Sequence, residues 1–191
     1  MKPTNKIRLA LYILAFALAL AYPVHTVISL ENEANVAGTF MFKVAAYDPY
    51  DIMRGHYMAL RILPDKFKKE DNSLDVRKKC YLQLGTDKDG FAEILGITNE
   101  KPENGPYLAL NGRIARRSYE PEGYFIIHYP FSKFYLNEKI ATQADAEVRR
   151  ISSATDSTDK LYLQVDILKD GNFKVDNLYI NGKTIRQHLE Q

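Results

Sequence analysis

The sequence predicts a mainly β protein: an N-terminal transmembrane helix followed by one antiparallel β-rich domain that carries a single short amphipathic helix. Three observations support this fold class. A long apolar stretch begins close to the N-terminus, behind basic residues. Short segments rich in Tyr, Phe, Ile and Val follow it, separated by Asp-Gly and Pro turns. Only one later segment places apolar residues at helical spacing.

Residues 1–30 are predicted to form a cytoplasmic tail and a membrane anchor. The stretch is mainly apolar from Ile7 onward, and as a helix it extends about 36 Å, enough to cross a hydrocarbon core of about 30 Å. Lys2, Lys6 and Arg8 favour a cytoplasmic N-terminus, because basic residues flanking a span stay inside. The orientation predicts that everything after the anchor lies outside the cytoplasm.

A cleaved signal peptide is the alternative for the same segment. Ala17-Leu18-Ala19 and Ala19-Leu20-Ala21 both fit the small-x-small pattern of a cleavage site. The length of the apolar stretch favours the anchor, and Pro23 follows both sites closely.

Residues 31–191 are predicted to form the β-rich domain. Asp89-Gly90 and Asp170-Gly171 each separate two apolar segments, which is typical of β-hairpins. The predicted strands are residues 39–47, 57–63, 79–85, 91–97, 107–117, 124–129, 161–168 and 173–180.

One internal similarity links the two hairpins. Tyr81-Leu82-Gln83-Leu84 and Tyr162-Leu163-Gln164-Val165 lie about 81 residues apart, and each precedes an Asp-Gly turn at the same distance. Two similar β units are one interpretation of this pattern, and two unrelated hairpins are the other.

Residues 137–150 form the one predicted helix of the β-rich domain. Asn137 suits the N-cap, and Glu138 suits the first turn. An apolar stripe at helical spacing indicates that the helix packs on a sheet, with a partner-binding helix as the alternative. The stripe consists of Ile140, Ala144, Val148 and Ile151.

Charge and cysteine content exclude several classes of protein. The formal net charge is +2, and the three basic residues ahead of the anchor account for the excess, so the β-rich domain is near neutral. A near-neutral domain lacks the basic surface that nucleic acid requires. Cys80 is the only cysteine, which excludes an internal disulfide. Its apolar neighbours indicate a buried thiol, with a reactive or lipidated thiol as the alternative.

The sequence predicts no catalytic residues, no cofactor and no metal site. The four histidines are far apart and lack metal-ligand spacing; they are His25, His56, His128 and His188. We expect His128 to be a core residue, because it alternates with apolar neighbours in a strand. No phosphate-binding Gly loop is present.

The segment DPYDIMRGHYMAL, residues 48–60, is the most distinctive of the chain. Pro49 fixes the backbone of a turn, Asp51 suits the cap of a single helical turn, and Gly55 permits positive φ before a strand. Arg54 is placed to pair with Asp48 or Asp51. We interpret the segment as structural, with contact to a ligand or partner as the alternative.

This segment resembles the signature of the GDYXXLXY family of membrane-anchored bacterial proteins. The matching residues are Pro49, Asp51, Arg54, Gly55, Tyr57 and Leu60. The similarity extends to Pro130-Phe131, Phe134-Tyr135, Glu138 and the closing segment Leu178-Tyr179-Ile180-Asn181-Gly182. His56 stands where the family has Asp, and Ile62 replaces the family's final Tyr. A catalytic Asp is not readily replaced by His, so these departures weaken an active-site interpretation.

The resemblance implies an accessory or interaction protein of the bacterial inner (cytoplasmic) membrane, single-pass, working with a multi-pass membrane protein. An extracytoplasmic module that binds a small molecule of the cell envelope is the alternative. A deep aromatic pocket with converging polar groups would favour the binding module. An exposed apolar patch near the membrane would favour the accessory protein. An enzyme related to signal peptidases is disfavoured, since no Ser lies between Leu30 and Leu63.

Overall fold

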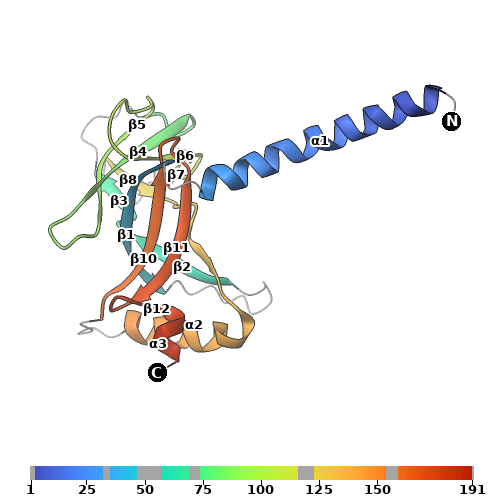
Figure 1. Ribbon diagram of the computed structural model, residues 1–191. Helices are drawn as coiled ribbons and strands as arrows, with labels where there is room; N and C mark the ends of the chain where they lie inside the picture. Colours follow the sequence, from blue (N-terminus) through green and yellow to red (C-terminus); the bar gives the residue numbers. More distant parts are fainter. Residues whose placement is uncertain are drawn as a thin grey trace. The chain divides into compact units, whose positions relative to one another are not determined.

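The computed structural model describes residues 3–31, 35–46, 57–68, 74–115, 123–153 and 159–190. The chain divides into two compact units, Met1–Val36 and Ala37–Gln191. The described part of the first unit is essentially one helix, and the second unit holds most of the strands (Figure 1). The mainly β fold with an N-terminal apolar helix is therefore confirmed.

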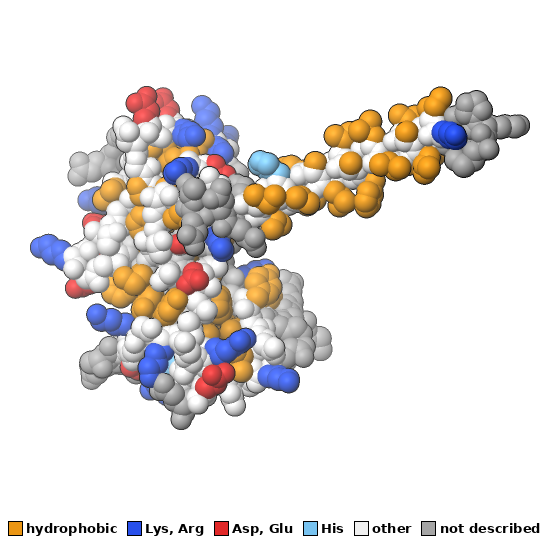
Figure 2. Space-filling model, in the orientation of Figure 1, with side chains coloured by type: hydrophobic (Ala, Val, Ile, Leu, Met, Phe, Trp, Pro, Cys, Tyr) orange, Lys and Arg blue, Asp and Glu red, His pale blue; other side chains and the backbone are white. Residues whose placement is uncertain are grey.

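Helix α1 (Pro3–Glu31) contains the apolar stretch predicted to be an anchor. Its part from Lys6 to Ile28 is 23 residues long and is apolar enough to cross a membrane, a test that a signal sequence also passes. Hydrophobic side chains lie exposed along the helix, as Figure 2 shows. Pro23 lies inside the helix without ending it.

The second unit contains three sheets. The six-stranded sheet has the order β12-β11-β10-β1-β2-β9 and forms a half-barrel, and the two three-stranded sheets have the orders β3-β8-β7 and β5-β4-β6. The elements are β1 (Val36–Ala46), β2 (Tyr57–Leu63), β3 (Lys66–Lys68), β4 (Lys79–Thr86), β5 (Ala92–Thr98), β6 (Tyr107–Asn111), β7 (Ile114–Ala115), β8 (Tyr124–Ile127), β9 (Lys133–Tyr135), α2 (Glu138–Ser153), β10 (Leu161–Leu168), β11 (Phe173–Ile180), β12 (Lys183–Thr184) and α3 (Ile185–Leu189).

The core is built from alternating strand residues and an aromatic cluster. In β10, alternate residues from Leu161 onward are buried, as expected for a strand with one face on the core. Phe42 is fully buried, and its ring centroid lies 5.4 Å from that of Tyr129 and 5.1 Å from that of Phe131. Burial of such rings supplies most of the driving force for folding.

The two hairpins share one register. Tyr81 pairs with Thr98 in β4–β5, and 81 residues later Tyr162 pairs with Tyr179 in β10–β11. Both ladders shift register at the same place, after Gln83 and after Gln164. The turns also correspond, because Gly90 and Gly171 have φ values of 85° and 84°. The two similar β units suggested by the sequence are therefore present.

These two β units exchange strands. The first hairpin (β4–β5) lies beside β6, which belongs to the second β unit. The second hairpin (β10–β11) lies beside β1, which belongs to the first β unit. The short strands are exchanged in the same way. Tyr57 of β2 pairs with Tyr135 of β9, and 67 residues after Tyr57, Tyr124 of β8 pairs with Lys68 of β3. Each unit therefore completes the sheet of the other.

Helix α2 packs its predicted stripe on the sheet, because Ala144, Val148 and Ile151 are buried while Ile140 is half-buried. The Asn137 side chain accepts a hydrogen bond from the Lys139 N–H at 3.1 Å, which confirms the predicted cap. Helix α3 is absent from the sequence prediction. It begins with a capping box that the sequence contains, Thr184-x-x-Gln187.

Two sequence expectations are wrong in detail. The predicted strand over residues 107–117 is broken at Gly112, whose φ is 61°, so β6 and β7 belong to different sheets. His128 is exposed rather than buried in the core. The alternation fails there because Phe125, Ile126 and Ile127 are all buried, which leaves His128 on the outside and Tyr129 inside.

Candidate functional site

Six predicted signature residues lie outside the described residues: Asp48, Pro49, Asp51, Arg54, Gly55 and His56. Their interpretation as a structural turn, with ligand or partner contact as the alternative, stays a prediction. The described part of the signature is β2 itself.

Strand β2 points its two signature side chains to different environments. Leu60 is 2% exposed and belongs to the core, and its N–H donates a 2.8 Å hydrogen bond to the Ser132 carbonyl. Tyr57 is half-buried at the other end of the strand, with its ring centroid 5.9 Å from that of Tyr135. The ammonium group of Lys133 lies 4.7 Å from the Tyr57 ring centroid, within cation–π range. Tyr57 therefore contacts β9, which lines a groove.

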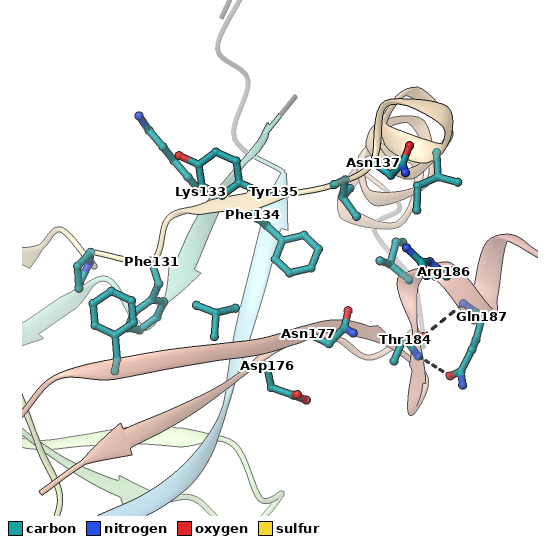
Figure 3. Close-up of a pocket in the computed structure, with 16 residues that line it drawn as sticks. Phe131, Lys133, Phe134, Tyr135, Asn137, Asp176, Asn177, Thr184, Arg186 and Gln187 are labelled. Atoms are coloured by element: carbon teal, nitrogen blue, oxygen red, sulfur yellow. Dashed lines mark hydrogen bonds between the residues drawn. The ribbon is translucent and has the colours of Figure 1, made fainter. Parts of the chain in front are cut away.

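The groove has a volume of about 850 Å³ and lies between two walls (Figure 3). One wall is β9 with the start of α2, where Glu138 is the first helical residue. The other wall is β11, β12 and α3. Phe131 closes one end, since its ring centroid lies 5.2 Å from that of Phe173 across the groove. The groove thus separates β9 from β11, which lie on opposite sides of the half-barrel's sheet order.

Several polar side chains of the groove already have hydrogen-bond partners. Thr184 and Gln187 form the reciprocal capping box, drawn as dashed lines in Figure 3. Asp176 accepts hydrogen bonds from the Tyr179 hydroxyl at 2.8 Å and from Gln164 at 3.2 Å. The hydrogen bond to Asp176 raises the pKa of Tyr179 to about 12. These bonds fix the walls and do not converge on one point in the groove.

A second copy of the signature strand lies in β8 and was missed by sequence reasoning. Tyr124 and Ile127 correspond to Tyr57 and Leu60 at the 67-residue spacing, and the two short-strand pairings are reciprocal. At this spacing Tyr129 corresponds to Ile62, so the second copy retains the final Tyr of the signature. The spacing Tyr-x-x-aliphatic-x-Tyr, which residues 124–129 share with the family signature, is the signal that would have revealed it.

Tyr129 is a buried tyrosine whose hydroxyl bonds to the backbone. Its hydroxyl donates a 2.8 Å hydrogen bond to the Pro64 carbonyl. Burial raises the pKa of Tyr129, and nearby Asp65 raises it further. The neutral phenol therefore serves a structural purpose at neutral pH.

Cys80 and His188 have distinct surroundings. Cys80 is 1% exposed, and burial raises the pKa of its thiol, which confirms the prediction of a buried side chain. His188 Nε2 lies 3.0 Å from Glu147 Oε1, a contact between α3 and α2 that the sequence did not indicate. Hydrogen bonds from Arg150 first, and from His188 second, lower the pKa of Glu147 to about 2. Within the described residues, no group of His, Cys, Asp and Glu is placed to hold a metal ion.

The structure defines a β-rich domain with exchanged strands, preceded by an apolar helix. The chain belongs to the GDYXXLXY protein family, whose model matches residues 19–178. No curated protein matches the sequence, and no solved structure matches the fold.

Proposed function

We propose that the protein is a membrane-anchored accessory subunit whose β-rich domain lies outside the cytoplasm and contacts a multi-pass membrane protein. The carrying observation is helix α1. The hydrophobic window of its 23-residue apolar part is 0% buried. Such a surface is costly in water and favourable in a hydrocarbon core.

The basic residues at the N-terminus support the orientation. Lys6 and Arg8 lie at the start of the apolar part, and basic residues flanking a span favour the cytoplasmic side of the bacterial inner membrane. Glu31 closes α1 at the opposite end. This asymmetry supports an extracytoplasmic position for the strands.

The groove favours an accessory protein over a small-molecule binding module. A small-molecule site requires an enclosing pocket with polar groups aimed at the ligand. Here the groove lies open between two walls, and Asp176, Thr184 and Gln187 are hydrogen-bonded to neighbouring side chains or backbone rather than aimed at one point in the groove.

Affinity purification of the full-length protein from membranes solubilised in mild detergent tests the proposal. We expect one multi-pass membrane protein to co-purify in fixed ratio. In a double variant, a cleaved signal peptide replaces α1, and Phe134→Glu places a charge in the groove. We expect this variant not to retain that protein. Purification of the full-length protein without any membrane protein would contradict the proposal.

A further inference from the structure

We propose that the groove between β9 and β11 binds one extended segment of the multi-pass partner, with alternating apolar side chains and an acidic residue. The inference rests on the proposed function and names the surface through which it acts. It is argued from the strand edges, from half-buried apolar side chains on both walls and from the charge of the groove.

The first wall offers a strand edge. β9 is the last strand of its sheet, and within the described chain only β2 pairs with it. The Leu60 N–H bonds to the Ser132 carbonyl, so the backbone groups of alternate residues face β2. By that alternation, the backbone N–H and C=O groups of Lys133 and Tyr135 point away from β2.

The second wall offers another edge. In the described chain β12 pairs only with Tyr179 and Ile180, at the end of β11. The rest of β11, from Phe173, has β10 on one side and the groove on the other. A channel bounded by two strand edges fits an extended chain, because strand addition satisfies the backbone groups of an edge.

The inner faces of the two walls are apolar and incompletely covered. Phe134, Phe173 and Val175 are half-buried. The first hairpin provides an internal comparison, since the residues equivalent to Phe173 and Val175 are Ala92 and Ile94. Those residues are only 6% and 8% exposed. The same positions are therefore covered in one β unit and open in the other, as expected for a surface that a partner covers.

The charge in the groove selects an acidic segment. Arg186 lines the groove from the second wall and forms no ion pair among the residues whose side chains are described, whereas the Lys133 ammonium lies 4.7 Å from the Tyr57 ring centroid and points away from β11 (Figure 3). Asp176 is the one acidic side chain among the described lining residues. It already accepts hydrogen bonds from Tyr179 and Gln164. An Asp or Glu in the partner segment would complement Arg186.

Site-specific photo-crosslinking in native membranes tests the inference. A benzophenone amino acid replaces Tyr135 at the rim, which is 72% exposed, or Leu95 on β5 as the control, which is 62% exposed. We expect the Tyr135 position to crosslink an extracytoplasmic segment of one multi-pass protein, identified by mass spectrometry and containing an acidic residue. The Leu95 position should not crosslink it.

A backbone variant separates strand addition from side-chain contact. With the crosslinker at Asn177 on the opposite wall, Tyr135→Pro removes an N–H that points away from β2, whereas Tyr135→Ala keeps it. We expect Tyr135→Pro to lower the crosslink yield about tenfold, the equivalent of one lost hydrogen bond, and Tyr135→Ala to change it little. Arg186→Glu should also lower the yield, by reversing the charge on the second wall.

Each other outcome overturns the inference. Crosslinks to lipid, to a second copy of this chain or to a helical segment would show a different occupant. Equal effects of Tyr135→Pro and Tyr135→Ala would exclude strand addition. If a multi-pass protein co-purifies but no groove position crosslinks it, the docking surface is wrong while the proposed function stands. If nothing co-purifies, the proposed function itself fails.

Discussion

The hydroxyl of Tyr129 donates a 2.8 Å hydrogen bond to the carbonyl of Pro64, the residue that directly follows the signature strand β2. Tyr129 belongs to the second copy of that strand, so the bond joins the ends of the two copies. The Tyr129 ring also packs 5.4 Å from Phe42 and 5.3 Å from Phe131, measured between centroids. The two β units thus meet at one aromatic cluster.

Removing this hydroxyl should have a modest effect, and removing the ring a large one. We expect Tyr129→Phe to lower the free energy of unfolding by about 1 kcal/mol, the usual net contribution of one hydrogen bond. Tyr129→Ala should lower it by about 3–5 kcal/mol, because it leaves a cavity. Urea unfolding of the full-length protein in detergent, followed by near-ultraviolet circular dichroism, measures both. Tyr135→Phe is the control, since that side chain is exposed; equal losses for all three variants would contradict the assignment.

The equivalent turn glycines should differ in their tolerance of alanine. Gly90 and Gly171 both have positive φ, which costs about 1–2 kcal/mol for any other L-residue. An added Cβ at Gly171 would lie 2.5 Å from Tyr107 Cε2, and Tyr107 is held by its hydrogen bond to the Lys169 carbonyl. At Gly90 the nearest atom is the flexible Met41 Cε, at 3.2 Å.

We therefore expect Gly171→Ala to lower the melting temperature clearly more than Gly90→Ala. The two substitutions are made at equivalent positions, and only the surroundings of these positions differ. A comparison of the two melting temperatures therefore measures the effect of the contact with Tyr107. A larger loss for Gly90→Ala would show that the clash at Gly171 is relieved by movement of the hairpin.

The contact between α2 and α3 should make stability depend on acid pH. The pKa of Glu147 falls to about 2 in the folded protein, below its ordinary value of 4.5, because Arg150 and His188 bond to the carboxylate. The stabilisation is complete above pH 4.5 and is lost as the pH falls toward 2. Solvent screening limits it to about 0–1 kcal/mol.

Glu147→Gln should therefore lower the melting temperature slightly at pH 7 and by less at pH 2.5, where most of the stabilisation is already lost. Thermal unfolding at both pH values measures the difference. Asp145→Asn is a suitable control, because Asp145 pairs with Arg149 on the exposed side of the same helix. An equal loss at both pH values would mean that Glu147 acts through packing rather than charge.

Local features of the fold were predictable from the sequence, and non-local ones were not. The Asp-Gly turns specify both hairpins because a glycine is required at their positive φ. The stripe of α2 follows from its periodicity. The exchange of strands leaves no local trace, since nothing in β6 states that its neighbour is β4 and not β10.

The groove was equally hidden from sequence reasoning. Its walls come from residues about 40 positions apart, such as Phe131 and Phe173, which meet only when the half-barrel curls. The sequence identifies Tyr57 and Leu60 as signature residues. It does not show that Leu60 faces the core and that Tyr57 contacts β9. His128 was misplaced because three consecutive buried residues interrupt the alternation on which its assignment depended.

Helix α1 should hold the protein in the membrane. We expect the full-length chain to stay with membranes washed in alkaline carbonate, because a 23-residue apolar helix is removed from hydrocarbon only at high cost. The N-terminal sequence of the mature protein distinguishes the anchor from a signal peptide. A soluble species beginning just after Ala19 or Ala21 would show cleavage.

As the matched control, Ala19→Leu with Ala21→Leu removes both cleavage patterns and keeps the apolar length. An anchor predicts that the paired substitution leaves the size and the membrane retention of the protein unchanged, whereas a signal peptide predicts that it converts a soluble protein into a retained one.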